Sequence, residues 1–229
     1  MPGILYGTGV GPGDPEYMTI KAVRLIREND VIAVPGTDAK ETVAYRIAVQ
    51  AVPELAEKEL VAVEMPMTHD REALARSHDA AADQLEYYLK QGKNVVFLTL
   101  GDPTVYSTYL YLQKRIASRG YGTELVSGIP SFCAAAARLG VSLVEWNEQL
   151  HVVPAVHRLE SRLDAPGNYV LMKSGKKMQQ VKELLRESGR EAVMVENCGM
   201  EDERVYRSLD EIPDDAGYYS LIIAKEGRK

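Results

Sequence analysis

The chain alternates short apolar runs with amphipathic stretches, and this alternation restricts the possible folds more than any other feature of the sequence. The run Asn94–Leu100 is apolar on both faces, as expected for a central strand of a parallel sheet. Strands that alternate with helices in this way are typical of a mostly parallel sheet covered by crossover helices. The other strands expected in this part of the chain are Ile4–Thr8, Asp30–Val34, Leu60–Met65 and Gly122–Ser127.

The ends of the expected helices are indicated by the residues that flank the amphipathic stretches. Thr19 and Asp70 are each expected to cap a helix N-terminus, because their side-chain oxygens can accept from free backbone N–H groups. Gly92 is expected to end the helix after Asp70 in a left-handed conformation. A helix is also expected over Glu41–Val52, and Ser131 is expected to cap an alanine-rich helix. The residues predicted to face inward are Ile20, Val23 and Ile26 in the first helix and Leu74, Ala81, Leu85 and Leu89 in the long one.

The pattern changes in the last third of the chain. Arg204–Ser208 and Tyr218–Ala224 are expected to form a strand pair joined by a turn rich in Asp, Pro and Gly. Further strands are expected at His151–Ala155, Tyr169–Lys173 and Ala192–Glu196, with a helix over Lys176–Ser188. This mixture predicts a second α/β domain whose sheet is partly antiparallel, so the expected domains are residues 1–127 and 128–229.

Four glycines, Gly7, Gly9, Gly11 and Gly13, stand at alternate positions between the first expected strand and the first helix. Their spacing does not match the G-x-G-x-x-G fingerprint of dinucleotide sites, and no P-loop motif occurs elsewhere. The Asp14 carboxylate can itself satisfy the free N–H groups that a phosphate would need. The glycines therefore predict a structural or substrate-gating turn rather than a phosphate cradle.

Composition excludes several classes of protein. The chain has 229 residues, 45% hydrophobic and 26% charged, with a net charge of -6, which disfavours a general nucleic-acid binder. Two cysteines without C-x-x-C spacing do not make a disulfide framework and fit a reduced, cytoplasmic setting. Neither a signal peptide nor an apolar stretch of the ~18 residues needed for a membrane span is expected.

Two turns are the best-placed ligand loops. LGDP follows the apolar strand at Asn94–Leu100, and SGIP follows the strand at Gly122–Ser127. Ligands of open α/β sheets collect at such carboxyl ends of strands. Small residues in both turns let a ligand approach the backbone closely.

Four motifs, in order, carry a resemblance to a known family: GTGVGPGDPEYMTIKA, MPMTHDREAL, FLTLGDPTVYSTYLYL and SGIPSFCAAAARLG. Their order and spacing resemble the tetrapyrrole methylases, which use S-adenosylmethionine in the cobalamin and sirohaem pathways. The run LGDPTVYSTY with the preceding MPMTHD is similar to the branch that methylates C20 of precorrin-2 or its cobalt complex. The resemblance extends from Gly7 to Ala224.

This resemblance implies a two-domain α/β fold and a homodimer, with the methyl donor in the cleft between the domains and the glycine-rich loop beside the tetrapyrrole. It implies donor contacts by Leu100, Gly101, Asp102, Val105, Tyr106, Pro130, Ser131, Met172, Asn197, Cys198 and Ala224. It implies acceptor contacts by Gly11, Pro12, Gly13, Asp14, Ser107 and Thr108.

Several of these residues also have ordinary structural interpretations. Asp102 is a candidate proton acceptor, but capping with a backbone contact is favoured because Asp is a strong cap residue. Tyr106, the other catalytic candidate, either lines the macrocycle or is a buried aromatic residue. Met172 either contacts adenine or fills the core. No catalytic residue is assigned, since substrate nitrogen or water can also take the proton.

The histidines show no metal-ligand spacing, so no protein metal site is expected. If cobalt is present, it arrives as part of the substrate, and His69, His151 or His157 is a candidate to face it. The expected function is methyl transfer to C20 of a precorrin-2-type tetrapyrrole, with the cobalt-loaded form favoured. The alternatives are a sister methylase acting at another ring carbon and a non-catalytic nucleotide- or metabolite-binding module.

Overall fold

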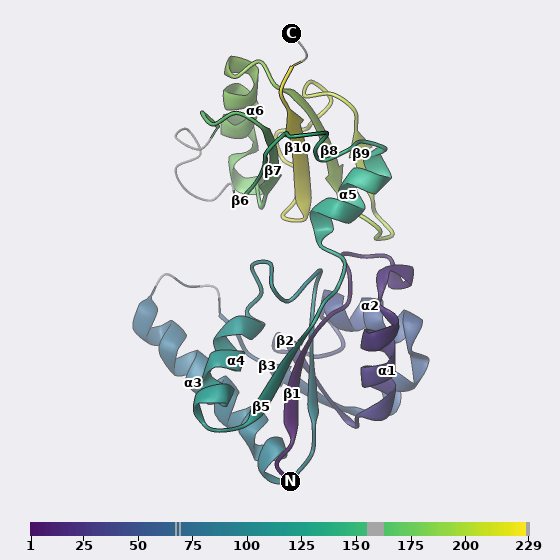
Figure 1. Ribbon diagram of the computed structural model, residues 1–229, viewed down its shortest axis with the longest axis vertical. Coiled ribbons are helices and arrows are strands. Elements are labelled where there is room, and N and C mark those ends of the chain that lie inside the picture. Colours follow the sequence, from purple (N-terminus) through teal and green to yellow (C-terminus); the bar gives the residue numbers. More distant parts are fainter. Residues whose placement is uncertain (67, 69, 155–162, 228–229) are drawn as a thin grey trace. The chain divides into compact units, whose positions relative to one another are not determined.

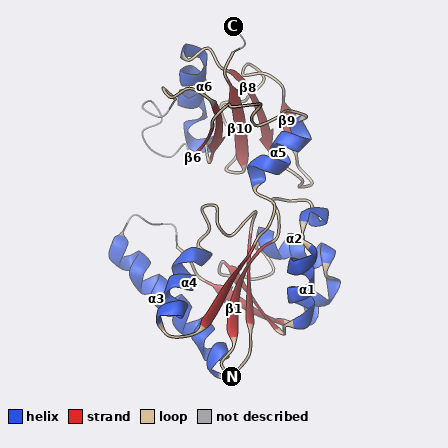
Figure 2. Cartoon of the chain, viewed as in Figure 1, coloured by secondary structure: helices blue, strands red, loops and turns tan. Residues whose placement is uncertain are grey.

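A computed structural model describes the chain except for residues 67, 69, 155–162 and 228–229 (Figure 1). The chain divides into two compact units, Met1–Pro130 and Ser131–Lys229. The boundary therefore lies at the end of the SGIP turn, slightly later than the predicted division after residue 127. Each unit contains a five-stranded sheet with helices on both faces (Figure 2).

The sheet of the first unit is entirely parallel, with strand order β3-β2-β4-β1-β5. Its helices form two layers, α1 and α2 on one face and α3 and α4 on the other (Figure 2). The strands are β1 (Ile4–Gly9), β2 (Val31–Pro35), β3 (Glu59–Val63), β4 (Val95–Thr99) and β5 (Gly122–Val126). The helices are α1 (Ile20–Glu28), α2 (Val43–Ala51), α3 (Arg71–Lys90) and α4 (Tyr109–Ser118), with short 3-10 turns η1 (Pro15–Tyr17) and η2 (Pro53–Glu57).

The strand order creates a topological switch point between β1 and β4. These two strands are neighbours, yet the chain leaves β1 toward the α1 face and leaves β4 toward the α4 face. The carboxyl edge of an open α/β sheet at such a switch point is where ligands bind.

The predicted caps of the first unit are confirmed. The Thr19 hydroxyl accepts from the Ala22 N–H at 3.2 Å, and an Asp70 carboxylate oxygen accepts from Glu72 and Ala73 at 2.9 and 3.1 Å. Gly92 follows the end of α3 with a φ of 78°, as predicted.

The predicted inner face of α1 is wrong at Ile20, which is 88% exposed. The residues that α1 buries are Ala22, Leu25 and Ile26. Because successive side chains are about 100° apart on a helix, Ile20 lies on the side opposite Ala22. The apolar character of Ile20 thus misled the assignment, while Ile26 is buried as expected.

The second unit has a mixed sheet of order β6-β7-β10-β8-β9, as predicted for a partly antiparallel arrangement. Helix α5 (Ser131–Leu139) covers one face and α6 (Met178–Glu187) the other, and a 3-10 turn, η4 (Gly175–Lys177), precedes α6. The strands are β6 (Leu150–Pro154), β7 (Asn168–Met172), β8 (Glu191–Glu196), β9 (Arg204–Tyr206) and β10 (Ser220–Lys225).

The predicted pairing of the last two strands is wrong. Strand β9 pairs with β8, and β10 lies between β8 and β7. The stretch between β9 and β10 packs Ile212 and Ala216 into the core on the α6 face, so it is too long and too apolar to act as a hairpin turn.

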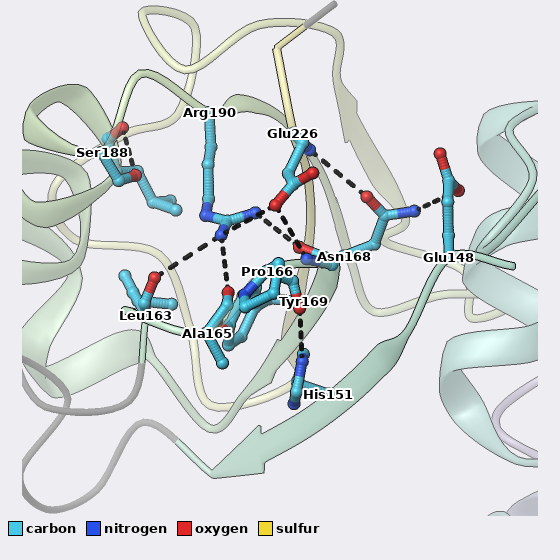
Figure 3. A network of polar contacts seen from close by, with 12 residues as sticks. Glu148, His151, Leu163, Ala165, Pro166, Asn168, Tyr169, Ser188, Arg190 and Glu226 are labelled. Carbon is cyan, nitrogen blue, oxygen red and sulfur yellow. Dashed lines mark hydrogen bonds and ion pairs between the residues drawn. The ribbon is translucent and has the colours of Figure 1, made fainter.

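Arg190 organises the segment that leads into β7 (Figure 3). Its guanidinium, 7% exposed as a side chain, donates to the carbonyls of Gly167 at 2.5 Å and Ala165 at 3.1 Å. It also lies 4.5 Å from the ring centroid of Tyr169, whose hydroxyl donates to Ala165 O at 2.7 Å. One buried cation thus satisfies backbone groups that have no strand partner.

Arg190→Ala is expected to lower the free energy of unfolding by about 2–4 kcal/mol, because the carbonyls of Gly167 and Ala165 lose a charged donor and the buried Tyr169 ring loses a cation. Urea denaturation followed by circular dichroism measures this. The matched control is Arg186→Ala, which removes an exposed ion pair with Asp210 and should cost about 0–0.5 kcal/mol. Equal costs for the two variants would contradict the assigned role of Arg190.

Candidate functional site

Three loops meet at the carboxyl edge of the first sheet, at the switch point between β1 and β4. Gly11 and Gly101 form an antiparallel bridge, in which Gly101 N–H donates to Gly11 O at 2.8 Å and Gly11 N–H donates to Gly101 O at 3.3 Å. Val10 N–H donates to Thr99 O at 3.0 Å. The glycine-rich loop is therefore joined to the LGDP turn by backbone hydrogen bonds.

Glycine is required where these loops touch. A Cβ on Gly128 would lie 2.2 Å from Gly101 O and 2.9 Å from Gly9 Cα. A Cβ on Gly9 would lie 2.4 Å from the same Gly101 oxygen. Gly9, Gly101 and Gly128, which we call the glycine contact, bring the loops after β1, β4 and β5 together at a distance that no side chain permits.

Asp102 fastens two of these loops with hydrogen bonds. It is 6% exposed, and its Oδ2 accepts from the Gly128 N–H at 2.9 Å. Its Oδ1 accepts from the N–H and hydroxyl of Thr104 at 2.8 and 2.5 Å. This is a turn cap with a backbone contact, the interpretation favoured from the sequence. However, the capped element is the Asp102–Val105 turn rather than a helix, since α4 begins only at Tyr109.

Gly7 and Tyr109 position the loop that leads into α4. The ring of Tyr109 is fully buried and occupies the space a Cβ on Gly7 would need, 2.1 Å away. Its hydroxyl lies 3.0 Å from both Leu5 O and Glu124 O, and burial raises the pKa of this hydroxyl. Ser107 is buried too, with its hydroxyl 2.9 Å from Thr99 Oγ1 and accepting from the Tyr109 N–H at 3.2 Å.

The remaining predicted residues of the first unit differ in exposure. Tyr106 is 50% exposed in a left-handed conformation with φ 51°, so it is not the buried aromatic residue that the sequence left as an alternative. Asp14 accepts from the Glu16 N–H at 2.9 Å and caps η1, as its position predicts. Leu100, Val105, Thr108 and Pro130 are half-buried, whereas Gly11, Pro12 and Gly13 are buried.

The charge of these loops is one-sided. Residues 7–14, 100–108 and 127–131 contain Asp14 and Asp102 but no Lys or Arg. A phosphate would find no cation here, whereas a cationic ligand of moderate size would meet hydroxyls, backbone groups and apolar side chains.

In the second unit, three of the predicted donor contacts lie at one end of the sheet, whereas Ala224 lies apart from them. Met172 ends β7 beside Leu221, and Asn197 follows β8 with its N–H donating to Tyr219 O at 3.2 Å, so both lie at the end of the sheet where β10 begins. Cys198 packs with Met172 into the core on the α5 face. Ala224 pairs with Tyr169, three residues before Met172, which places it about 10 Å along the strand.

Ala224 is also buried on the opposite face, against α6. The antiparallel direction of β10 explains this separation, because its first residues rather than its last lie beside Met172. Ser131 is the first residue of α5 rather than a residue before it.

The structure adds residues that the sequence did not single out as functional. Gly128, Thr99 and Tyr109 hold the loops, although the sequence predicted no ligand contact for any of them. Gly128 is the second residue of the SGIP turn, but its contact with Gly9 and Gly101 depends on strand order.

Within the described residues, no group of three or more His, Cys, Asp or Glu side chains could hold a metal ion. His69 and His157, two of the histidines considered for the substrate metal, lie outside the described residues. His151 stacks on Tyr169 at 4.6 Å and lies 2.9 Å from Pro166 O (Figure 3). No helix in the described part of the chain is both long and apolar enough to cross a membrane.

Comparison with known proteins agrees with this architecture. The family model "Tetrapyrrole (Corrin/Porphyrin) Methylases" matches residues 4–213. A probable cobalt-precorrin-2 C(20)-methyltransferase of Methanocaldococcus jannaschii is 34% identical over 98% of this chain and 97% of its own length. A precorrin-2 C(20)-methyltransferase of a Sinorhizobium species is 31% identical over 96% of this chain and 94% of its own length.

A solved structure extends the comparison to the fold. The uroporphyrin-III C-methyl transferase of Thermus thermophilus, complexed with S-adenyl homocysteine, has a TM-score of 0.73 and is 25% identical, covering 98% of both chains. The family model, the relatives matched over almost their full length and the solved structure all point to the same family. The chain therefore belongs to the tetrapyrrole methylase family.

Proposed function

We propose that this chain is the S-adenosylmethionine-dependent methyltransferase that methylates C20 of a precorrin-2-type tetrapyrrole in cobalamin biosynthesis. The observation that carries the proposal is the identity of 34% with a probable cobalt-precorrin-2 C(20)-methyltransferase across almost the full length of both proteins. That relative also favours the cobalt-loaded acceptor over the metal-free one.

The donor half of the proposal is supported by the loops at the switch point. When bound, S-adenosylmethionine supplies an electrophilic methyl group on a positively charged sulfur. Loops without Lys or Arg fit such a cation, and Leu100 and Val105 offer half-buried apolar surface beside it. Asp102 would hold the LGDP turn against Gly128 and so keep the donor-binding backbone fixed. Met172, Asn197 and Cys198 stay predicted donor contacts.

Positioning is the main contribution we assign to the protein. Holding donor and acceptor near attack distance can lower the activation barrier by about 7–11 kcal/mol. No general base is then needed to form the new carbon–carbon bond. The Asp102 carboxylate accepts three hydrogen bonds, so we assign it to loop geometry rather than to removing the C20 proton.

We also propose that the enzyme works in the cytoplasm as a homodimer. The family resemblance supports the dimer, and Cys133 and Cys198 form no disulfide, which suits a reducing compartment.

A labelled-methyl assay tests the function directly. The full-length protein is mixed with methyl-labelled S-adenosylmethionine and either sirohydrochlorin or its cobalt complex, and NMR locates the label. Label at C20, with faster turnover of the cobalt complex, is expected. Label at another carbon would replace the proposal with a sister activity. No transfer, with no thermal stabilisation by S-adenosylhomocysteine, would favour a non-catalytic module.

A further inference from the structure

The first unit contains a cavity of about 530 Å³ beside the switch-point loops. It lies between the loop after β3, the first half of α3 and helix α4. Thr108 lines it, and this residue belongs to the same loop as Asp102 and Tyr106. The volume is within the range of about 300–1,000 Å³ that small-molecule sites occupy.

Two arginines line this cavity, in contrast to the cation-free loops next to it. Arg71, in the first turn of α3, is exposed and has no ion-pair partner within the described part of the chain. Arg115 of α4 uses Nε to bind Asp79 at 2.6 Å and Nη1 to bind Tyr111 O at 3.2 Å. Its Nη2 has no partner among the described residues and is left to bind a ligand.

One wall of the cavity is aromatic and flat. Tyr111 stacks on His78 with ring centroids 4.8 Å apart and an interplanar angle of 13°. Tyr111 is 51% exposed, whereas His78 is 8% exposed, so His78 supports the ring from behind. Burial and the nearby Arg115 lower the pKa of His78, which keeps this support uncharged at neutral pH.

A cavity with two cations, a flat aromatic wall and apolar side chains from α3 and from the loop after β3 suits one class of ligand. That class is a planar conjugated acid, whose ring packs on Tyr111 and whose carboxylate reaches the arginines. A nucleotide phosphate fits less well, because Arg71 and Arg115 come from different helices and no glycine-rich backbone cradle lines this cavity.

We propose that this cavity binds one carboxylate-bearing edge of the tetrapyrrole acceptor, with Arg71 and Arg115 on the carboxylate and Tyr111 against the adjoining pyrrole ring. The inference rests on the proposed function, because the acceptor is the planar polyacid that this enzyme would use. The proposal also explains how a protein of net charge -6 binds a polyanion. Arg71 and Arg115 supply local positive charge next to the loops that contain no Lys or Arg.

Arg71→Ala tests the proposal with little risk to folding, since its side chain is exposed. The KM for the tetrapyrrole should rise about 10-fold or more, the range expected when a charged hydrogen bond is lost, while the KM for S-adenosylmethionine and kcat stay the same. The KM of Arg71→Lys for the tetrapyrrole should lie between those of the wild type and of Arg71→Ala. Arg76→Ala is the matched control, because Arg76 is on the same helix, pairs with Glu72 and does not line the cavity.

An esterified acceptor separates carboxylate binding from a general charge effect. Methyl esterification of the tetrapyrrole should raise the KM of the wild-type enzyme for this acceptor. It should change little the KM of the double variant, in which Arg71→Ala is combined with Arg115→Ala. A KM for Arg71→Ala equal to that of Arg76→Ala, or an equal ester penalty in all variants, would overturn the proposal.

A titration of the protein with sirohydrochlorin, followed by absorbance, tests acceptor binding by the cavity independently of methyl transfer. If the wild type binds sirohydrochlorin but transfers no methyl group, the proposed function fails, and weaker binding by Arg71→Ala still supports the cavity. If transfer occurs and Arg71→Ala binds normally, the cavity assignment fails alone. If the wild type binds no tetrapyrrole, both are overturned.

Discussion

Gly128→Ala is expected to weaken binding of S-adenosylhomocysteine by about 100-fold and to lower the free energy of unfolding by about 2–3 kcal/mol. The added methyl would lie 2.2 Å from Gly101 O and 2.9 Å from Gly9 Cα, and backbone atoms cannot move aside as a flexible side chain can. The loops after β1, β4 and β5 must then separate. Isothermal titration calorimetry and urea denaturation measure the two effects.

The matched control is Gly122→Ala, at the other end of the same strand. A Cβ there would lie 3.3 Å from Cγ1 of Ile4, a contact that a shift of a few tenths of an ångström relieves, and it would meet no atom of the glycine contact. Gly122→Ala should therefore leave ligand affinity unchanged. If Gly128→Ala bound S-adenosylhomocysteine as tightly as Gly122→Ala does, the glycine contact would not form part of the donor site.

Asp102→Ala is expected to lower the free energy of unfolding by about 2–4 kcal/mol and to weaken donor binding by at least ~30-fold. It removes the acceptor of the buried Gly128 N–H and of the Thr104 N–H. Asp102→Asn should lose less, because its amide oxygen can still accept from Thr104, while its NH₂ group would face the Gly128 N–H. Calorimetry and single-turnover kinetics give the donor affinity and the rate of transfer.

This pair of variants separates a positioning role from a proton-accepting one. A positioning residue changes the donor Kd, and the single-turnover rate at saturating donor changes less. A normal donor Kd combined with a large loss of rate in Asp102→Asn would instead identify a base. Asp38→Ala is the control, since Asp38 accepts from the N–H two residues on, at Lys40, but in an exposed loop.

The sequence predicted those parts of the fold that depend on local chemistry. Thr19, Asp70 and Gly92 were assigned from side-chain and backbone preferences that act within one helix turn, and all three are confirmed. The apolar run at Asn94–Leu100 likewise indicated the buried strand β4. Such features need no knowledge of which strands are neighbours.

Strand order was the part that periodicity could not supply. Arg204–Ser208 and Tyr218–Ala224 have the composition of a hairpin, yet β8 intervenes between β9 and β10 because the intervening segment packs into the core. The same limit applies to the site. The motifs selected the LGDP and SGIP turns, but the Asp102–Gly128 hydrogen bond and the cavity around Arg71 arise from tertiary contacts across the unit.

The glycine contact also sets a rule for engineering the loops. Gly9, Gly101 and Gly128 interlock through their backbones, so a graft that changes one loop geometry must be redesigned together with the other two. Two residues of the following segment take no part in the glycine contact: Tyr106, which is 50% exposed, and Thr108, which lines the cavity. Libraries that aim to redirect the enzyme toward other macrocycles should therefore vary these two positions first and leave the three glycines untouched.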